Sequence, residues 1–295
     1  MNKIATITLD SDTFAEEISA EYSNCEKEKI ITETYKKSIE RIFDVLNKHG
    51  IKITFFIISS HLEYSDCVKI TQKILSEGNE IGDHSYSHDR KIINLKENEF
   101  LKEIENSKNI LHKKLNVTPS GFRSPGAEIN ESMIKILSSK NYLYDSSSNP
   151  SFLYSKLKKI YFASFRKEKY NHYKITNTDL PRKINSIYEF PLTASAFLGL
   201  PLFNFFLSPL GKFGTGILNR TIEKKEYLNY VIHLHEFISD NEINGIHIKK
   251  GLMNIFNNTI KEKINFLNEA VKRFKNLSEI KTLKDFYYNL SYIEK

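Results

Sequence analysis

Two patterns of apolar positions alternate along the first half of the chain. Short continuous apolar runs predict buried β-strands, whereas apolar residues that recur every three or four positions predict amphipathic helices. The stretch 34–49 shows the helical pattern clearly, since Ile39, Ile42 and Leu46 share one face and Gly50 offers a stop. The strands predicted in this half are 4–9, 51–58, 80–84, 121–123 and 142–145, and the helices are 34–49, 68–76, 96–115 and 129–139.

This alternation favours an α/β fold with a parallel sheet, open or closed into a barrel, and active residues at the carboxyl ends of its strands. Beyond about residue 150 the pattern becomes irregular, with strands expected at 186–190 and 230–235 and a long helix at 249–274. No repeat or polar linker interrupts the chain. We therefore expect one domain over residues 1–295, with an irregular apolar insertion at about 190–220 and a C-terminal helical extension.

The composition is that of a globular protein with a sizeable core, since 40% of the residues are hydrophobic and 27% are charged. The net charge of +7 is spread along the chain and interleaved with glutamate, so no nucleic-acid partner is expected. Cys25 and Cys67 are isolated, which argues against a disulfide framework and against a thiolate zinc site. The first residues enter a strand pattern at once, so we expect no signal peptide and a cytoplasmic location.

Polar side chains with metal-binding chemistry follow two of the predicted strands. Asp10 and Asp12 are two residues apart, and an extended backbone would place both side chains on one face. His84 and His88 are four residues apart behind another strand end. Each pair alone has an ordinary explanation, an Asx-turn or a surface histidine pair. Together they predict three ligands, a spare carboxylate and one open coordination position, which is typical of hydrolytic rather than structural zinc.

Two later motifs add candidates for catalysis. Arg123 begins the sequence Arg-Ser-Pro-Gly, in which the arginine could polarise a catalytic carboxylate and the tight turn at Gly126 could aim a backbone N–H at an oxyanion. His233 and His235 alternate at the end of a predicted strand, and either could act as a general acid.

The ordered set of motifs resembles the polysaccharide deacetylases of carbohydrate esterase family 4, which share the NodB homology domain. The resemblance rests on Asp10-x-Asp12, His84-Ser-x-x-His88, Arg123-x-Pro, Tyr144-Asp-Ser-Ser and the late His233, and it spans about residues 1–240. It implies a distorted (β/α) barrel of about seven strands. Common family members have adjacent aspartates, so Ser11 places this chain nearer an Asp-x-Asp subgroup. The chain also has no tryptophan, so the family's usual Asp-x-x-Asp-Trp element, which bears on the support of His233, is absent.

The resemblance implies that the protein removes an acetyl or formyl group from the nitrogen of an amino sugar. The substrate would be a cell-envelope polysaccharide or a lipid-linked glycan precursor. The implied roles are Asp10 as general base, Arg123 as its orienting partner, Gly126 as an oxyanion donor, His233 as general acid with His235 as the alternative, and Asp12, His84 and His88 as ligands of a divalent ion, most simply Zn²⁺.

Residues 190–211 contain no charged side chain, but three prolines interrupt the stretch and argue against a transmembrane helix. One interpretation is a buried strand and loop over the barrel. The other is an apolar surface at 197–210, including Phe203, Phe205 and Phe206, that makes peripheral contact with the inner face of a membrane.

Two other functions remain open from the sequence. The run from Ile7 to Thr13 is similar to the first motif of haloacid-dehalogenase-like phosphatases, in which Asp10 would be the nucleophile and Asp12 would bind magnesium. That alternative leaves His84 and His88 without a role. The second alternative is a catalytically inactive barrel that binds glycan.

Overall fold

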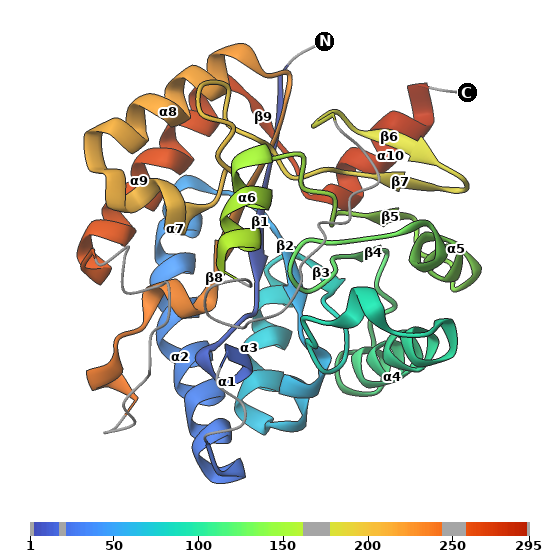
Figure 1. The fold of residues 1–295 in the computed structure, drawn as a ribbon. Coiled ribbons are helices and arrows are strands. Elements are labelled where there is room, and N and C mark those ends of the chain that lie inside the picture. The colour runs from blue at the N-terminus through green and yellow to red at the C-terminus, as the bar shows by residue number, and fades with distance from the viewer. Residues whose placement is uncertain (1–2, 18–21, 162–177, 244–257, 294–295) are drawn as a thin grey trace.

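The chain forms a curled sheet of mostly parallel strands with helices packed outside it (Figure 1). The computed structural model describes residues 3–17, 22–161, 178–243 and 258–293. Seven strands are parallel to their neighbours, in the order β7 (Ile187–Glu189), β5 (Tyr144–Asp145), β4 (Gly121–Phe122), β3 (Glu80–Asp83), β2 (Thr54–Ile57), β1 (Ile4–Asp10) and β8 (Tyr227–His233). Strand β6 (Arg182–Ile184) runs antiparallel to β7, and β9 (Glu279–Ile280) pairs with β1. The expected α/β distorted barrel is confirmed.

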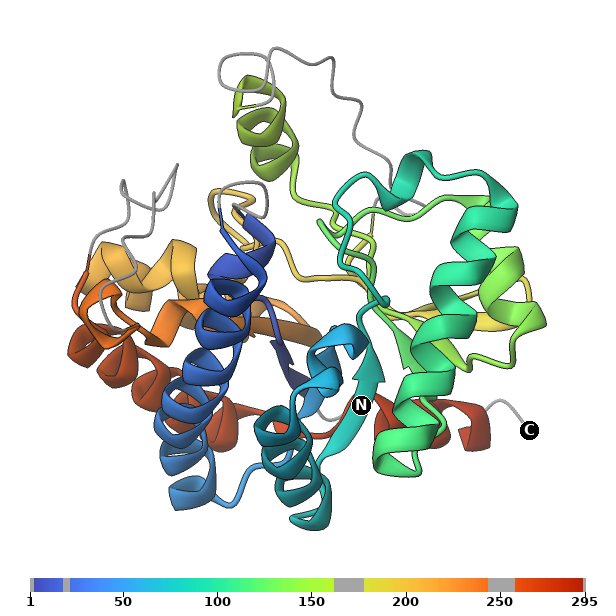
Figure 2. The same cartoon turned by 90° about the horizontal axis from the view of Figure 1, so that it is seen from below.

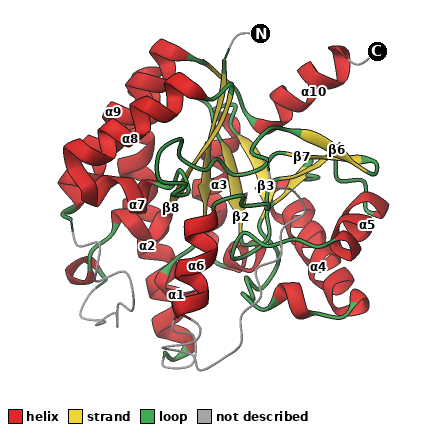
Figure 3. Ribbon diagram, turned by 45° about the horizontal axis from the view of Figure 1, so that its top comes forward, coloured by secondary structure: helices red, strands yellow, loops and turns green. Residues whose placement is uncertain are grey.

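Helices surround the sheet on its outer side, as Figures 2 and 3 show. The predicted helices of the first half are all present, although α2 begins ten residues earlier than expected. Its start is set by a capping box in which Ser23 and Glu26 bond each other's backbone N–H groups. The helices are α1 (Phe14–Glu17), α2 (Asn24–His49), α3 (Ser65–Ser76), α4 (Glu97–Leu115), α5 (Glu131–Ser139), α6 (Phe152–Tyr161), α7 (Asn204–Leu207), α8 (Gly211–Lys224), α9 (Ile260–Leu277) and α10 (Leu283–Ile293).

Among the described strands, no ladder joins β7 to β8. The apolar insertion lies in the gap between these two strands. The backbone of Leu202 accepts a hydrogen bond from Val231 of β8 at 3.1 Å, and Asn229 of β8 donates its N–H to Thr193 at 2.8 Å. Phe203 and Phe206 are buried in this seam. The buried interpretation is therefore right for these two side chains, and their predicted exposure to a membrane was wrong. The insertion also contains α7 and leads into α8, where no regular structure was expected.

The amino-terminal end of the barrel is filled by aromatic side chains. Tyr144 donates its hydroxyl to Glu80 at 2.6 Å and lies against the backbone of Gly121. A Cβ atom at position 121 would come within 1.9 Å of the Tyr144 ring, so only glycine fits there. The amino-terminal end is therefore closed by packed side chains. The polar residues at the carboxyl ends of the strands lie at the other end of the barrel.

The C-terminal segment returns to the amino-terminal end of the barrel. Helix α9 confirms part of the helix predicted at 249–274, whose first residues, 249–257, lie outside the described part of the chain. Helix α10, which was not predicted, is held where Leu283 donates its N–H to Thr54 and Lys284 donates its N–H to Glu80, both at 2.9 Å. None of the helices in the described residues combines the length and apolar character needed to span a bilayer.

Candidate active site

The two aspartates of the first motif share one face because Ser11 is turned the other way. Ser11 donates its backbone N–H to Phe56 at 3.0 Å, and its hydroxyl accepts the N–H of Ile58 at 2.8 Å. Both bonds tie the end of β1 to β2. Asp10 and Asp12 are both buried, so the residue that separates them keeps their carboxylates in the same polar interior.

His84 and His88 reach the same point from a tight loop rather than from a helix. Ser85 and His88 both have positive φ angles, of 66° and 55°. Such strained backbone persists where surrounding contacts fix it. Here Asp83 accepts the N–H of Ser85 at 2.8 Å, and the Ser85 hydroxyl accepts the N–H of His88 at 3.0 Å. The loop therefore folds both imidazoles back toward β1.

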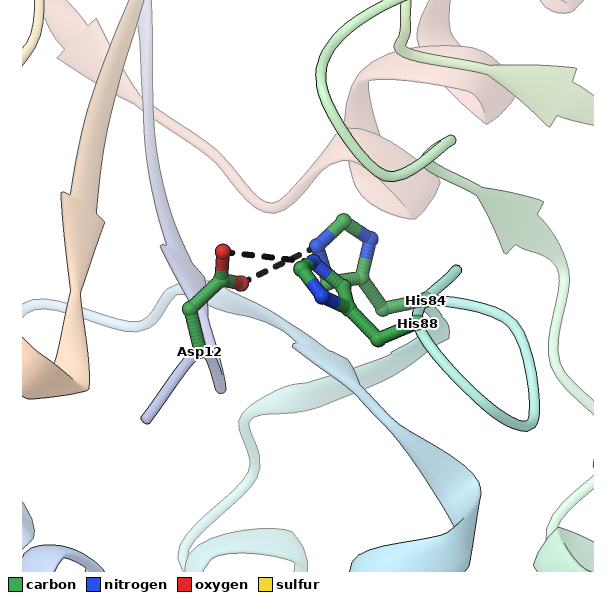
Figure 4. Close-up of side chains that lie close together, drawn as sticks. All are labelled: Asp12, His84 and His88. Atoms are coloured by element: carbon green, nitrogen blue, oxygen red, sulfur yellow. Dashed lines mark hydrogen bonds and ion pairs between the residues drawn. The ribbon is translucent and has the colours of Figure 1, made fainter. Parts of the chain in front are cut away.

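Asp12, His84 and His88 form a compact group of three possible metal ligands (Figure 4). Nε2 of His84 lies 3.1 Å from Oδ1 of Asp12, and Nε2 of His88 lies 3.2 Å from Oδ2. Ligand atoms bound to one zinc ion at about 2 Å in a tetrahedron lie about 3.3 Å apart. The spacing of these side chains therefore suits a small divalent cation.

The hydrogen-bond pattern of the histidines supports the same conclusion. Nδ1 of His84 donates to the carbonyl oxygen of Arg123 at 2.7 Å, so a neutral His84 presents the bare lone pair of Nε2 to Asp12. The ring of His88 is also buried; its Nε2 faces Oδ2 of Asp12 at 3.2 Å, and its Nδ1 has no hydrogen-bond partner among the described residues. A lone pair that faces a carboxylate requires a proton or a cation between them. The group therefore fits a metal ion.

Positive charge stabilises this group in its metal-free form as well. Burial opposes ionisation, but the neighbouring charge of His88 and the hydrogen bond from His84 lower the pKa of Asp12 well below its usual value. Burial likewise lowers the pKa of His84, yet the hydrogen bond to Asp12 and the charges of Asp10 and Asp12 produce a net rise. The arrangement favours the ionised form of Asp12.

Arg123 holds the carboxylate of Asp10. Its Nη1 donates to Oδ1 of Asp10 at 2.7 Å and to the hydroxyl of Thr8 at 2.8 Å. The buried guanidinium lies over the ring of Phe56, 4.3 Å from the ring centre. The expected Arg123–Asp10 pair is present, and it leaves Oδ2 of Asp10 directed toward β8.

His233 lies across the site from Arg123, with Nε2 3.8 Å from Oδ2 of Asp10. Its other ring nitrogen, Nδ1, lies 3.2 Å from Oε1 of Glu236, which also accepts the His233 backbone N–H at 2.8 Å. Burial lowers the pKa of His233, but the hydrogen bond that its ring donates to Glu236 and the charges of the nearby aspartates outweigh burial and raise the pKa to about 9. These contacts favour the protonated form of His233.

His235 and Gly126 are less closely tied to Asp10. The ring of His235 stacks on that of His233 at 5.3 Å, and its backbone N–H donates to the carbonyl oxygen of Asp12 at 3.0 Å. Gly126 has a φ angle of 75° and lies within a turn closed by a hydrogen bond from Ala127 to Ser124. The tight turn is confirmed, while the oxyanion role of Gly126 stays a prediction.

Several supporting residues were missed from the sequence. Glu236 accepts from both the ring and the backbone N–H of His233, and the His-x-x-Glu spacing was a signal for it. Asn204 donates its side-chain amide to Glu236 at 2.5 Å and accepts the hydroxyl of Tyr230 at 2.7 Å. Asp83, which directly precedes His84, accepts the hydroxyls of Ser107 and Tyr142 rather than contacting either imidazole ring. The group that orients the His84 ring is the backbone carbonyl of Arg123.

Comparison with known sequences identifies relatives of the chain. Residues 25–144 match the model of the polysaccharide deacetylase family. A peptidoglycan-N-acetylglucosamine deacetylase from Bacillus cereus is 31% identical over 103 residues, which is 35% of this chain and 36% of that protein. The peptidoglycan-N-acetylmuramic acid deacetylase PdaC from Bacillus subtilis is 34% identical over 93 residues, or 32% of this chain and 19% of that protein. The matches thus span about a third or less of these curated relatives.

Solved structures extend the fold likeness to almost the whole chain. A candidate polysaccharide deacetylase from Mycobacterium smegmatis superposes with a TM-score of 0.68 at 13% identity, covering 100% of this chain and 92% of that one. A family pseudoenzyme from Bacillus anthracis gives a TM-score of 0.53 at 12% identity, covering 97% and 66%. The recognition made from the sequence motifs is confirmed, and the chain is related to the polysaccharide deacetylases.

Proposed function

We propose that the protein is a metal-dependent hydrolase that removes an N-acetyl or N-formyl group from an amino sugar. The substrate is a cell-envelope polysaccharide or a lipid-linked glycan precursor, and residues 1–295 act as one catalytic domain. The single observation that carries the proposal is the convergence of Asp12, His84 and His88 beside a carboxylate, Asp10, that Arg123 holds apart from them.

The proposed chemistry follows from the two oxygens of Asp10, of which Oδ1 is bonded to Arg123 and Oδ2 is not. Asp12, His84 and His88 would hold the ion, most simply Zn²⁺, which when bound supplies Lewis-acid polarisation of the acyl carbonyl and a lower pKa for the attacking water. Asp10 accepts the proton of that water through the oxygen that Arg123 leaves free. His233 donates a proton to the amide nitrogen as the C–N bond breaks, so the products are a carboxylic acid and an amine. The backbone N–H of Gly126 would help to hold the oxyanion.

The direct test offers the zinc-loaded protein three kinds of substrate: N-acetylglucosamine oligosaccharides, purified peptidoglycan and an N-formyl amino sugar. We expect release of acetate or formate with a matching mass loss from one of these. No release from any of them, at any zinc concentration, would contradict the proposal.

The two alternatives fit the geometry less well. A phosphatase needs Asp10 as a free nucleophile, but here its Oδ1 is bonded to Arg123 and its neighbour Asp12 lies between two histidines. Phosphate release from p-nitrophenyl phosphate in magnesium would favour it nevertheless. An inactive glycan-binding barrel has a structural counterpart in the pseudoenzyme, but the base, the ligand group and an acid candidate all lie together in this chain.

The choice between His233, the last residue of β8, and His235, in the 3₁₀ turn that follows it, gives a prediction. We expect His233→Ala to lower kcat by about 10²–10⁴-fold, the usual range for loss of a general acid, with the metal retained. His235→Ala should lower kcat less than about tenfold, because the His235 ring packs on His233 and does not contact Asp10. Steady-state kinetics with metal analysis compares the two variants. A larger loss in His235→Ala would reverse the assignment.

Glu236 gives a prediction about pH. A raised pKa means that the protonated form of His233 is lost as pH rises through that pKa, so His233 sets the alkaline limb of the rate profile. Glu236→Gln removes the charge that accepts from Nδ1, and a bond of this kind is worth about 1.5–3 kcal/mol. The alkaline limb should therefore move to lower pH by about one unit or more. A kcat/KM profile that ends at the same pH would contradict this role.

A membrane surface remains part of the proposal, but on different residues from those first expected. Phe197 and Phe213 are 61% and 56% exposed, and both line a shallow hollow with Arg220. The guanidinium of Arg220 lies 5.9 Å from the centre of the Phe197 ring, and Lys212 is exposed beside Phe213. Aromatic side chains interleaved with cations suit the headgroup region of an anionic bilayer. We propose that this surface contacts such a bilayer.

Vesicles of phosphatidylglycerol test the surface. The double variant Phe197→Ser/Phe213→Ser should weaken vesicle binding about tenfold or more, since each buried aromatic contributes about 1.5–3 kcal/mol, while hydrolysis of a soluble oligosaccharide stays unchanged. Leu277→Ser is the control, because Leu277 is 51% exposed on α9. Equal binding by all three proteins would remove the membrane from the proposal.

A further inference from the structure

Two acidic side chains face each other in the barrel interior without a cation between them. Asp145 ends β5 and Glu189 ends β7, and the two residues are direct partners in the parallel ladder. Both are completely buried. Partners on neighbouring strands lie about 4.8 Å apart with their side chains on the same face. Two ionised carboxylates so placed would repel each other strongly.

The hydrogen bonds of the two carboxyl groups differ. Both oxygens of Asp145 act as acceptors, one from the Ser147 N–H at 2.9 Å and one from the Ser147 hydroxyl at 2.7 Å. Oε1 of Glu189 accepts the N–H of Ser148 at 3.0 Å. Oε2 of Glu189 is buried and receives no hydrogen bond from a donor in the described residues. An oxygen in this position is satisfied if it carries the proton and donates it to Asp145.

The electrostatics agree with that assignment. Burial raises the pKa of both carboxyl groups, and the charge of Asp145 raises the pKa of Glu189 further. Asp145 also gains stabilisation as an anion from Ser147. Together with the unpartnered Oε2 of Glu189, these directions favour Glu189 as the member that holds the proton.

The two serines bonded by this pair, Ser147 and Ser148, directly follow Ser146, which supports Arg123. The carbonyl oxygen of Ser146 accepts Nε of Arg123, and the Ser146 hydroxyl accepts Nη2, both at 2.9 Å. The next hydroxyl, that of Ser147, accepts the N–H of Ser124 at 2.7 Å. The segment 146–148 thus lies between the carboxyl pair on one side and Arg123 with its neighbour on the other.

We propose that Asp145 and Glu189 share a single proton and act as a positioning pair, which holds the segment 146–148 so that Arg123 is aimed at Asp10. This inference rests on the proposed hydrolase function for its effect on rate, but not for the shared proton itself. The pair lies behind Arg123 and touches no reacting atom.

The donor and acceptor pattern makes the two amide substitutions unequal. Glu189→Gln places an N–H donor where the proton was and keeps an oxygen for Ser148, so we expect it to retain most of kcat. Asp145→Asn turns an acceptor of Ser147 into a donor and should lower kcat. Glu189→Leu removes the donor and leaves Asp145 as a lone buried charge. A resulting displacement of Arg123 should lower kcat on the order of 10²-fold with little change in KM.

Two measurements separate this inference from the hydrolase proposal. The infrared difference between the wild type and Glu189→Gln at pH 7 should contain the C=O band of a protonated carboxylic acid, whether or not the protein hydrolyses anything. Kinetics then test positioning, with zinc content and thermal unfolding followed in each variant. Absence of that band, or equal loss of kcat in Glu189→Gln and Glu189→Leu, would overturn the inference. No activity in the wild type would instead count against the hydrolase.

Discussion

Asp12→Ala should abolish both metal binding and turnover. Asp12 contributes the one carboxylate of the ligand group and lies between the two imidazoles, at 3.1 Å and 3.2 Å. Loss of supporting groups around a metal typically weakens binding 10–100-fold, and loss of a ligand should exceed that, so about 10²-fold is a lower bound. Zinc titration followed by calorimetry measures the change, and kcat should fall below detection.

Thermal unfolding provides an independent readout of the same variant. An ion that binds only the folded state stabilises it, by about 2.7 kcal/mol at 100 times its dissociation constant. The wild type should therefore gain Tm when zinc is added, and Asp12→Ala should not. Asp66→Ala is a matched control, because Asp66 is a carboxylate on α3 that pairs with Lys36 at the surface. If zinc raised the Tm of Asp12→Ala as much as that of the wild type, the ion would bind at a different site.

Asp10→Asn should retain the metal but lose turnover, whereas Asp12→Ala should lose both. The amide oxygen of asparagine can still accept the bond from Arg123, so the local structure is kept. What disappears is the group that accepts a proton from the attacking water. Loss of a general base lowers kcat by about 10²–10⁴-fold. Zinc content and kcat measured on one preparation test both halves of the prediction.

The comparison of the two aspartate variants is more informative than either alone. If Asp10→Asn kept full activity, Asp10 would not be the base. If it lost zinc as completely as Asp12→Ala, Asp10 would belong to the ligand group. A phosphatase would instead lose all turnover in Asp10→Asn while hydrolysing phosphate esters in its wild-type form.

The fold could be predicted because its strands carry their own signal. Parallel strands are buried on both faces, so β2 appears in the sequence as an almost wholly apolar run and β1 as apolar residues interspersed with threonine. Strand β3 has Ile81 as its one apolar side chain, so its signal was weaker. The start of α2 was misjudged because its first turns are charged and only the capping box marks their beginning. Helix α10 was missed because its position depends on contacts with Thr54 and Glu80, which are distant in sequence.

Burial is the property that the sequence conveyed least well. The apolar segment at 190–211 was consistent with either a membrane contact or a buried core. The structure distinguishes the two, because part of the segment fills the space between β7 and β8, where no strand pairing occurs among the described residues. Phe203 fills that gap, while Phe197 lies outside it. Hydrophobicity alone cannot separate these two fates, because a folded surface also contains many apolar atoms.

The members of the site were predictable, but their supports were not. Strand ends, spacing and the family resemblance led to Asp10, Asp12, His84 and His88. Their supports are backbone groups and small hydroxyls, such as the Arg123 carbonyl on His84 and the Ser11 hydroxyl on Ile58. Serine and carbonyl groups occur throughout any chain, so no pattern distinguishes those that a site uses.

The most direct measurement of the central claim is a zinc titration of the metal-stripped protein, with acetate or formate release from N-acylated amino sugars as the signal. Release should be absent without metal and should rise until one ion is bound per chain, then stay constant. Full release by the stripped protein, or no release at any zinc concentration, would contradict a metal-dependent deacylase.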